Sequence, residues 1–207
     1  MDLRFRCLAA IVPLLLASPT GVATQTQPTP EPSVSAARVA DDGPNVGPYF
    51  NWFGCWHPTS TITYRTTGAS TNWASATVLA AATWTNSTQV TLNQVSTGGR
   101  IVVTSANYPT STWSGQAPGS TTCSGNTYDF GDVSIRFNER FDYYSSNAEK
   151  SLAMHEWGHA MGLAHKGTTT TPCDDVVIMN GHDSRRFFDC GKINPTQDDK
   201  NGINYLY

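Results

Sequence analysis

Residues 155 to 165 read His155-Glu156-Trp157-Gly158-His159-Ala160-Met161-Gly162-Leu163-Ala164-His165, and the interpretation of the whole chain starts from this stretch. In an α-helix His155 and His159 lie one turn apart on the same face, so their ring nitrogens can converge on one ion. A third histidine six residues further on cannot come from the same continuing helix. Gly162 accepts the positive φ at which a chain turns back. The spacing therefore predicts that His165 returns to the other two histidines.

The three histidines predict a zinc site, and the glutamate beside them predicts catalysis there. Three neutral imidazoles leave a zinc ion with its full double positive charge and an open fourth position for water. Zinc lowers the pKa of such a water to about 7, and Glu156 can accept its proton and later deliver it to a leaving group. The pattern thus predicts one catalytic zinc held by His155, His159 and His165, with Glu156 as general base and acid.

A candidate methionine turn follows the motif. Val176-Val177-Ile178-Met179-Asn180 comes after His165 and a short polar loop. The extended histidine motif followed by such a turn resembles the metzincin clan of zinc endopeptidases, in which the methionine lies beneath the zinc without binding it. The resemblance implies this position for Met179, whereas the apolar run alone fits an ordinary core methionine equally well.

Further stretches resemble one group of that clan, the matrixins or matrix metalloproteinases. Residues 194–207 are similar to their last helix, residues 60–65 to their first strand and residues 74–84 to their first helix. The resemblance covers roughly residues 58 to 207, and it implies an α+β, zincin-like domain with a twisted mixed β-sheet of about five strands and three helices. It also implies a secreted, extracellular-matrix type of endopeptidase that hydrolyses peptide bonds by attack of a zinc-bound water, with Glu156 as general base and acid.

Some features depart from the matrixins. Lys166 stands where they usually carry serine, and the loop over residues 167–173 is longer than theirs. Cysteines on both sides of Met179 are similar to an arrangement in the small secreted snapalysin-like proteases of actinobacteria, although those carry aspartate where this chain has its third histidine. Only His57 and His182 remain after the three ligands are counted. We therefore expect no second, histidine-rich structural zinc site.

The beginning of the chain predicts export. Arg4 and Arg6 precede an apolar run over residues 8–17 and a small-residue site at 21–23, which predicts a signal peptide over residues 1–23 and a secreted, extracellular protein. Residues 24–47 are rich in Thr, Pro, Ser, Gln and Ala and predict a flexible leader or short propeptide. Residues 48–207 are then expected to form one zinc metallopeptidase catalytic domain. No later segment approaches the roughly 20 apolar residues of a membrane helix.

Four cysteines remain once the signal peptide is removed, and an even number in an oxidising compartment predicts two disulfides. They allow three pairings, of which we favour Cys173 with Cys190 and Cys55 with Cys123. A rival interpretation makes Cys55 an inhibitory thiolate on the zinc, which would leave one cysteine without a partner.

Periodicity and composition predict the remaining elements. Strands are expected at residues 60–66, 89–95, 100–105 and 132–137, a core-backing helix at 71–84, and a long surface loop at 109–127. The resemblance implies that the strand over 132–137, at an edge or half-buried, borders the cleft and pairs with an extended substrate. Ser146 with Glu149 predicts a capping box at the start of the zinc-binding helix.

The acidic residues allow alternatives. Asp129, Asp132 and Asp142 could bind calcium, but surface carboxylates explain them as well, so calcium stays unassigned. Asp198 and Asp199 resemble matrixin acids that tie the last helix to the methionine turn or to the mature beginning of the chain. A solvated helix start explains this pair equally well.

Partners follow from charge and from the predicted chemistry. A formal net charge of -3 argues against nucleic acid and gives no membrane-surface signature. We expect protein or peptide substrates and a monomer. A glycan-binding module is the alternative class of function, because tryptophans among abundant Ser, Thr and Asn could line such a surface, although aromatic residues in a compact domain more often form the core. The candidates are Trp52, Trp56, Trp73, Trp84 and Trp113.

Overall fold

A computed structural model describes residues 50–117, 123–129, 131 and 133–207. The predicted signal peptide (1–23) and leader (24–47) lie outside the described residues, as do residues 48 and 49 at the start of the predicted catalytic domain.

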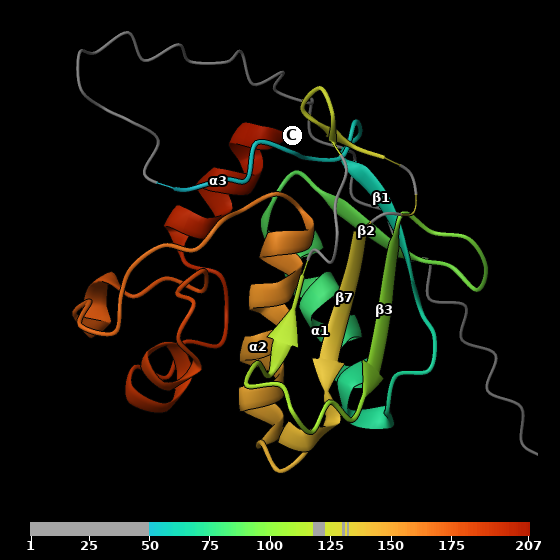
Figure 1. The fold of residues 1–207 in the computed structure, drawn as a ribbon. Coiled ribbons are helices and arrows are strands. Elements are labelled where there is room, and N and C mark those ends of the chain that lie inside the picture. Colours follow the sequence, from blue (N-terminus) through green and yellow to red (C-terminus); the bar gives the residue numbers. More distant parts are fainter. Residues whose placement is uncertain (1–49, 118–122, 130, 132) are drawn as a thin grey trace, which may run out of the picture. The chain divides into compact units, whose positions relative to one another are not determined.

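A five-stranded mixed sheet forms the centre of the fold, in the order β2-β1-β3-β7-β4 (Figure 1). β1 pairs in parallel with β2 and β3, β3 pairs in parallel with β7, and β4 runs antiparallel to β7. The strands are β1 (Thr61–Thr66), β2 (Thr91–Gln94), β3 (Ile101–Ala106), β4 (Gly115–Gln116) and β7 (Val133–Asn138). This confirms the predicted mixed sheet of about five strands.

Two helices cover one face of the sheet, and a third lies nearer the end of the chain. They are α1 (Thr71–Ser87), α2 (Ser146–Ala160) and α3 (Gln197–Leu206). Trp73 of α1 stacks on Phe137 of β7 with ring centroids 4.6 Å apart, and Trp157 of α2 meets Tyr64 of β1 edge-on at 4.9 Å. Tyr64 and Phe137 pair with Ile101 and Ser105 of β3, which are four residues apart and so point to the same side, and α1 and α2 therefore share one sheet face. The expected three helices are confirmed.

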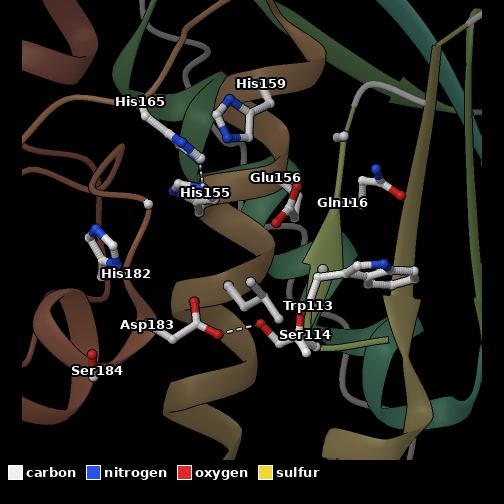
Figure 2. A pocket seen from close by; sticks show the side chains of 15 residues that line it. Trp113, Ser114, Gln116, His155, Glu156, His159, His165, His182, Asp183 and Ser184 are labelled. Atoms are coloured by element: carbon white, nitrogen blue, oxygen red, sulfur yellow. Dashed lines mark hydrogen bonds between the residues drawn. The ribbon is translucent and has the colours of Figure 1, made fainter. Parts of the chain in front are cut away.

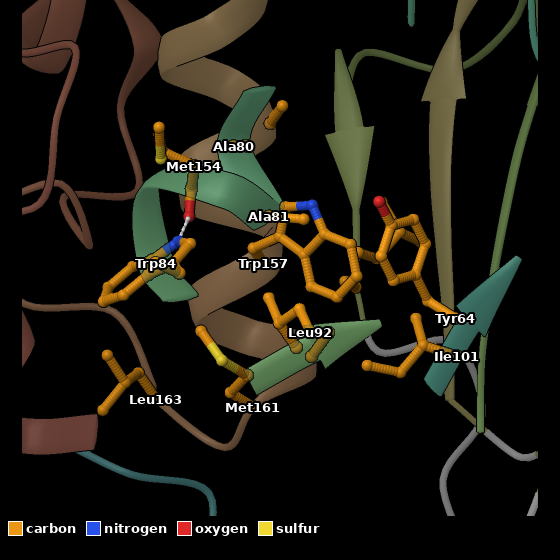
Figure 3. Packing of buried hydrophobic residues seen from close by; sticks show 14 of the residues in the cluster. Tyr64, Ala80, Ala81, Trp84, Leu92, Ile101, Met154, Trp157, Met161 and Leu163 are labelled. Carbon is orange, nitrogen blue, oxygen red and sulfur yellow. Dashed lines mark hydrogen bonds between the residues drawn. The ribbon is translucent and has the colours of Figure 1, made fainter. Parts of the chain in front are cut away.

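The core between helices and sheet is dominated by tryptophan. Figure 3 shows the indole of Trp157 between Ala81 of α1 and Tyr64 of β1. Its ring N–H donates to the carbonyl of Thr77, and that of Trp84 donates to the carbonyl of Met154. A buried tryptophan stabilises a fold by roughly 3–5 kcal/mol relative to alanine. These contacts fix α2, and with it the histidine motif, against the rest of the domain.

The structure corrects two predictions, one about the loop over 109–127 and one about which strand borders the cleft. The segment 109–127, expected to be a loop, contains β4 and β5 (Cys123–Ser124). β5 pairs with β6 (Thr127–Tyr128) in a separate two-stranded sheet, and β6 begins at the last residue of this segment. The strand predicted to border the cleft, β7, is interior, and β4 takes the edge. A two-residue strand has no periodicity to detect.

The predicted capping box of α2 is also wrong. Ser145 caps the helix, and its side chain accepts a hydrogen bond from the amide of Ala148. Glu149 is buried and bonds to Asn72 of α1 instead. Helix α1 itself extends three residues beyond the expected end.

Both favoured disulfides are present, Cys55–Cys123 and Cys173–Cys190. The second encloses the segment that contains Met179. Short helical turns cover Glu139–Phe141, Cys173–Asp175 and Ser184–Asp189. Among the helices of the described residues, none is both long and apolar enough to cross a lipid bilayer.

Candidate metal centre and active site

The end of α2 brings the three predicted ligands together. The helix stops at Ala160, and Gly162 adopts a φ of 116°, which reverses the chain. The amide of Leu163 then bonds back to the carbonyl of Gly158. A side chain at Gly162 would also meet the carbonyl oxygen of Cys55, so both backbone angle and space require glycine. The turn returns His165 to the face of α2, as the motif predicts.

Backbone carbonyls orient two of the imidazole rings. Nδ1 of His155 lies 2.8 Å from the carbonyl of Ile178, and Nδ1 of His159 lies 2.7 Å from the carbonyl of Leu163. A nitrogen that faces a carbonyl carries the ring proton, so Nε2 of each ring keeps its lone pair. Burial lowers the pKa of His159 to about 3 and the pKa of His155 well below its usual range, which favours the neutral rings that a metal requires.

The spacing of the ligand atoms fits zinc. One nitrogen from each of the three histidines lies within 4.8 Å of the other two, and the Nε2 atoms of His155 and His165 are 3.2 Å apart. Two nitrogens bound to one tetrahedral zinc at about 2.0–2.1 Å are separated by roughly 3.3 Å. The residues present therefore fit a zinc ion, and His155, His159 and His165 would hold it.

Glu156 faces the same space (Figure 2). The backbone amide of Ala117 donates to its carboxylate, while Oε2, although buried, has no hydrogen-bond partner among the described residues. Burial raises the pKa of this carboxyl group to about 8, and Arg186 opposes the rise. A carboxylate with one free oxygen beside three metal-binding nitrogens is the arrangement expected of a general base.

The methionine turn lies beneath the histidines. Met179 is buried and packs against Gly158, the residue of α2 between the two helical ligands. The Asp199 carboxylate of α3 accepts hydrogen bonds from the amides of Ile178 and Met179 at 2.9 and 3.2 Å. The amide of Lys166 donates to the carbonyl of Met179. These bonds join the third-ligand loop, the turn and the last helix.

A cavity of about 440 Å³ opens beside Glu156 and the three histidines. One wall is the segment from Thr112 to Ala117, which contains β4, and the other is the segment from Gly181 to Ser184 (Figure 2). Sequence reasoning missed Ser114 and Asp183, which lie in these walls, and Arg186 behind them. No motif marks these residues, since their proximity arises only when the cleft is assembled.

The positions of several residues in the structure bear on alternatives that the sequence left open. Cys55 is bonded to Cys123, so it is not a free thiolate on the metal. Trp73 and Trp84 are fully buried, which removes two of the five tryptophans from any glycan-binding surface. Asp142 accepts the ring N–H of Trp73, and the calcium candidate Asp132 lies outside the described residues.

The two acids of α3 and the two remaining histidines are also placed. Asp199 is tied to the methionine turn and Asp198 pairs with Lys166 at 2.5 Å, so neither is a merely solvated helix start. His57 is buried against the carbonyl of Ala160, whereas His182 lines the cavity.

The mixed sheet, the three helices and the three converging histidines agree with the resemblance of the sequence to matrixin-like metzincins, and the chain is similar in sequence to one such protein. The chain is 34% identical over 87 residues to a putative matrix metalloproteinase of Spodoptera frugiperda ascovirus 1a, a match that covers 37% of this chain and 21% of the viral protein. The chain thus spans about a fifth of that relative. Among solved structures it is similar to myroilysin, with a TM-score of 0.41 and 23% identity over 54% of this chain and 52% of that one. No family model matches the sequence.

Proposed function

We propose that this chain is a secreted, zinc-dependent endopeptidase. The observation that carries the proposal is the convergence of His155, His159 and His165 with the unpartnered Oε2 of Glu156 in one cavity. A purely structural zinc site would need the histidines but not a buried carboxylate with a free oxygen beside an open cavity. The similarity to a putative matrix metalloproteinase supports the same class of activity.

The residues of the chain divide the chemistry among them. The three histidines would hold zinc, which when bound acidifies a water and polarises the scissile carbonyl. Glu156 accepts a proton at Oε2 and later gives it to the departing amine, while the Ala117 amide keeps the other carboxylate oxygen in place. The carbonyls of Ile178 and Leu163 keep the rings of His155 and His159 in the ligand orientation. Met179 supports the site from below without contributing a ligand.

The edge strand supports an extended peptide substrate. Among the described strands β4 pairs only with β7, so its outer backbone groups are available to a substrate strand. It runs directly beside Glu156, and a Cβ atom added at Gly115 would meet the carboxylate. Main-chain pairing of this kind would place a scissile bond next to the histidines and would accept many sequences. The substrate-pairing role first expected for the 132–137 strand is therefore proposed for β4.

Replacement of Glu156 tests the proposal. We expect Glu156→Gln to retain about one zinc per chain. Its cleavage of casein should fall by roughly a hundred- to ten-thousandfold, because the base is lost. Replacing the ligand His165 by alanine should lose the metal as well, whereas His182→Gln, a change to a nearby histidine outside the triad, should retain it. Metal analysis and casein cleavage with and without a chelator measure both effects. Equal cleavage by the unaltered chain and Glu156→Gln would contradict the proposal.

The setting of the enzyme is part of the proposal. The arginine-led apolar run at the start of the chain supports export, and the two disulfides support an oxidising, extracellular destination. We propose protein or peptide substrates, one zinc ion, no nucleic-acid or membrane partner, and a monomer. Sequencing the first residues of the secreted protein would show whether cleavage falls after residue 23 and whether residues 24–47 are removed.

A further inference from the structure

The cavity beside Glu156 ends in a polar wall. Beyond His155 and Glu156, Ser114 and Asp183 line the cavity from opposite walls, and their side chains meet across it (Figure 2). Ser114 directly precedes β4, and Asp183 lies in the segment after the methionine turn. A side chain that enters the cavity from a peptide bond beside Glu156 therefore points at these two residues.

Asp183 is held by three donors. Its Oδ1 accepts from Nη2 of Arg186 at 2.5 Å, and its Oδ2 accepts from the hydroxyls of Ser114 and, at 3.5 Å, Tyr144. Burial, followed by the charge of Asp183, raises the pKa of Tyr144, so this hydroxyl stays protonated and remains a donor. The Asp183 side chain is 24% exposed and lines the cavity.

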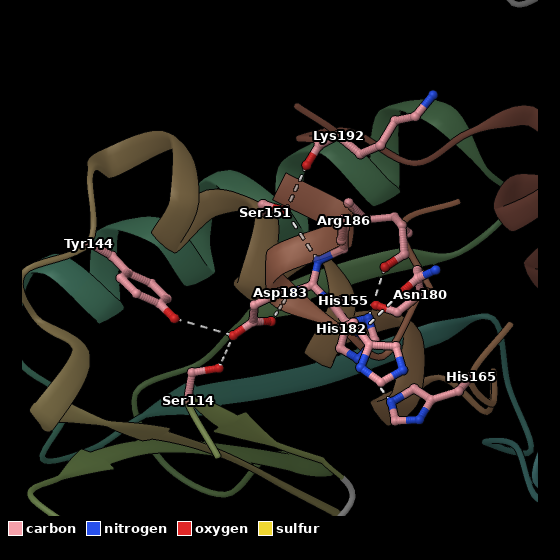
Figure 4. A network of polar contacts seen from close by, with 11 residues as sticks. Ser114, Tyr144, Ser151, His155, His165, Asn180, His182, Asp183, Arg186 and Lys192 are labelled. Carbon is pink, nitrogen blue, oxygen red and sulfur yellow. Dashed lines mark hydrogen bonds and ion pairs between the residues drawn. The ribbon is translucent and has the colours of Figure 1, made fainter. Parts of the chain in front are cut away.

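Arg186 prevents Asp183 from turning away. Its side chain is 1% exposed, with Nε on the hydroxyl of Ser151 of α2 at 3.2 Å and Nη1 on the carbonyl of Asn180 at 2.7 Å (Figure 4). A guanidinium is a rigid, planar fork, and all three of its nitrogens are used here. The carboxylate is therefore fixed to α2 and to the methionine-turn segment, and it is in place before any ligand arrives.

Asp183 and Ser114 offer hydrogen-bond acceptors at this end of the cavity. An ionised carboxylate offers about four lone-pair positions, of which three are occupied, and a serine hydroxyl that donates its only hydrogen to Asp183 keeps its own lone pairs. A second carboxylate would face these lone pairs directly. An aliphatic side chain would bury them without partners. A cation gains less than at an isolated aspartate, because Arg186 already balances the charge of Asp183.

We infer that this cavity selects an uncharged, hydrogen-bond-donating side chain next to the scissile bond, with an amide such as that of glutamine as the best fit. The inference rests on the proposed endopeptidase function and deepens it. Asp183 and Ser114 are its specificity-determining residues, and Arg186 is a positioning residue that acts through Asp183. A site built to pair with a polar side chain rejects an analogue that lacks the donor, because its own buried polar groups are left unpaired.

Fluorogenic peptides test this selectivity. The peptides share one sequence and carry Gln, Leu, Glu or Lys at one position beside the scissile bond, on each side in turn. The zinc-loaded secreted chain should cleave the Gln peptide with a kcat/KM about tenfold above that of the Leu peptide, and Glu should be the poorest. A preference for Leu on both sides would overturn the inference while leaving the endopeptidase function standing. Failure to cleave casein and every peptide would overturn both.

Substitutions of Asp183 and Ser114 test whether these two residues determine the preference for glutamine. Asp183→Asn places N–H donors where acceptors were, so the ratio of Gln to Glu cleavage should fall about tenfold or more. Ser114→Ala leaves the Asp183–Arg186 pair intact and frees one lone pair, so it should raise Lys cleavage relative to Gln. Asp189→Asn makes the same carboxylate-to-amide change at a more exposed residue, which pairs with Arg185 and ends the short helical turn that follows Asp183, and it should leave every ratio unchanged. Unaltered ratios in both Asp183→Asn and Ser114→Ala, each with zinc bound, would overturn the assignment.

Discussion

At the scale of single residues, the site depends on two glycines, whose lack of a side chain leaves room for functional groups. Gly115 and Gly181 lie on opposite walls of the cavity, and each leaves room for one functional group. A Cβ atom at Gly115 would lie 2.8 Å from Oε1 of Glu156, and one at Gly181 would lie 2.7 Å from Nδ1 of His165. Both distances are shorter than packed atoms tolerate. The two glycines therefore position the base and the third ligand separately.

This separation predicts two different defects. In Gly181→Ala the His165 ring must move, so zinc affinity should fall about tenfold or more. In Gly115→Ala the metal ligands are untouched, so zinc should be retained while kcat falls, because Glu156 is displaced. Competition with a chromogenic chelator gives the affinity, and peptide cleavage at saturating zinc gives kcat. If Gly115→Ala lost zinc and Gly181→Ala kept it, the assignment of the two glycines would be wrong.

At the scale of elements, α3 acts on the metal centre through one carboxylate. Asp199 accepts four hydrogen bonds, two from the amides of Ile178 and Met179 and two from the amide and hydroxyl of Thr196. The carbonyl of Ile178 in turn faces Nδ1 of His155. The chain of contacts runs from the last helix through the methionine turn to a ligand.

Replacing this carboxylate by an amide should destabilise the domain. Asp199→Asn sets N–H groups against one or more of the backbone donors, and we expect a loss of roughly 2–4 kcal/mol of unfolding free energy and weaker zinc binding. Asp198→Asn is the matched control, because its pairing with Lys166 is partly exposed and contributes at most about 1 kcal/mol. Thermal unfolding of the zinc-loaded variants measures both. Equal melting temperatures for the two variants would show that Asp199 does not organise the turn.

The elements differ in how far the sequence predicts them. The helix of the motif and the four longer strands follow from periodicity and β-branched content, which are local properties. β4 does not, because its two residues become a strand only through antiparallel pairing with β7, whose residues Phe137 and Arg136 lie about twenty positions later. Arg186 was missed for a similar reason. It stands in a polar stretch, and only the fold shows that its charge is buried between Ser151, Asn180 and Asp183.

At the scale of the whole molecule, a buried histidine outside the metal centre also has to be neutral. His57 is 1% exposed, and its Nε2 lies 3.1 Å from the carbonyl of Ala160, at the end of the helix that carries the ligands. Nδ1 is buried without a partner among the residues the structure describes. Burial lowers the pKa of His57 to about 4. Acid therefore acts on the fold at this position as well as on the metal ligands.

The sign of the pH effect follows from the two states of His57. Its pKa is about 6.5 in the unfolded chain and about 4 in the folded one, so the unfolded chain binds more protons between these values. Stability is complete above pH 6.5 and falls toward pH 4, by about 3 kcal/mol for this residue at most. His57→Gln keeps an N–H for the Ala160 carbonyl but cannot be protonated, so its unfolding free energy should fall less over this interval. Urea unfolding of the metal-free proteins at pH 7 and 4.5 separates His57 from zinc release. Identical losses in the two proteins would show that His57 does not contribute.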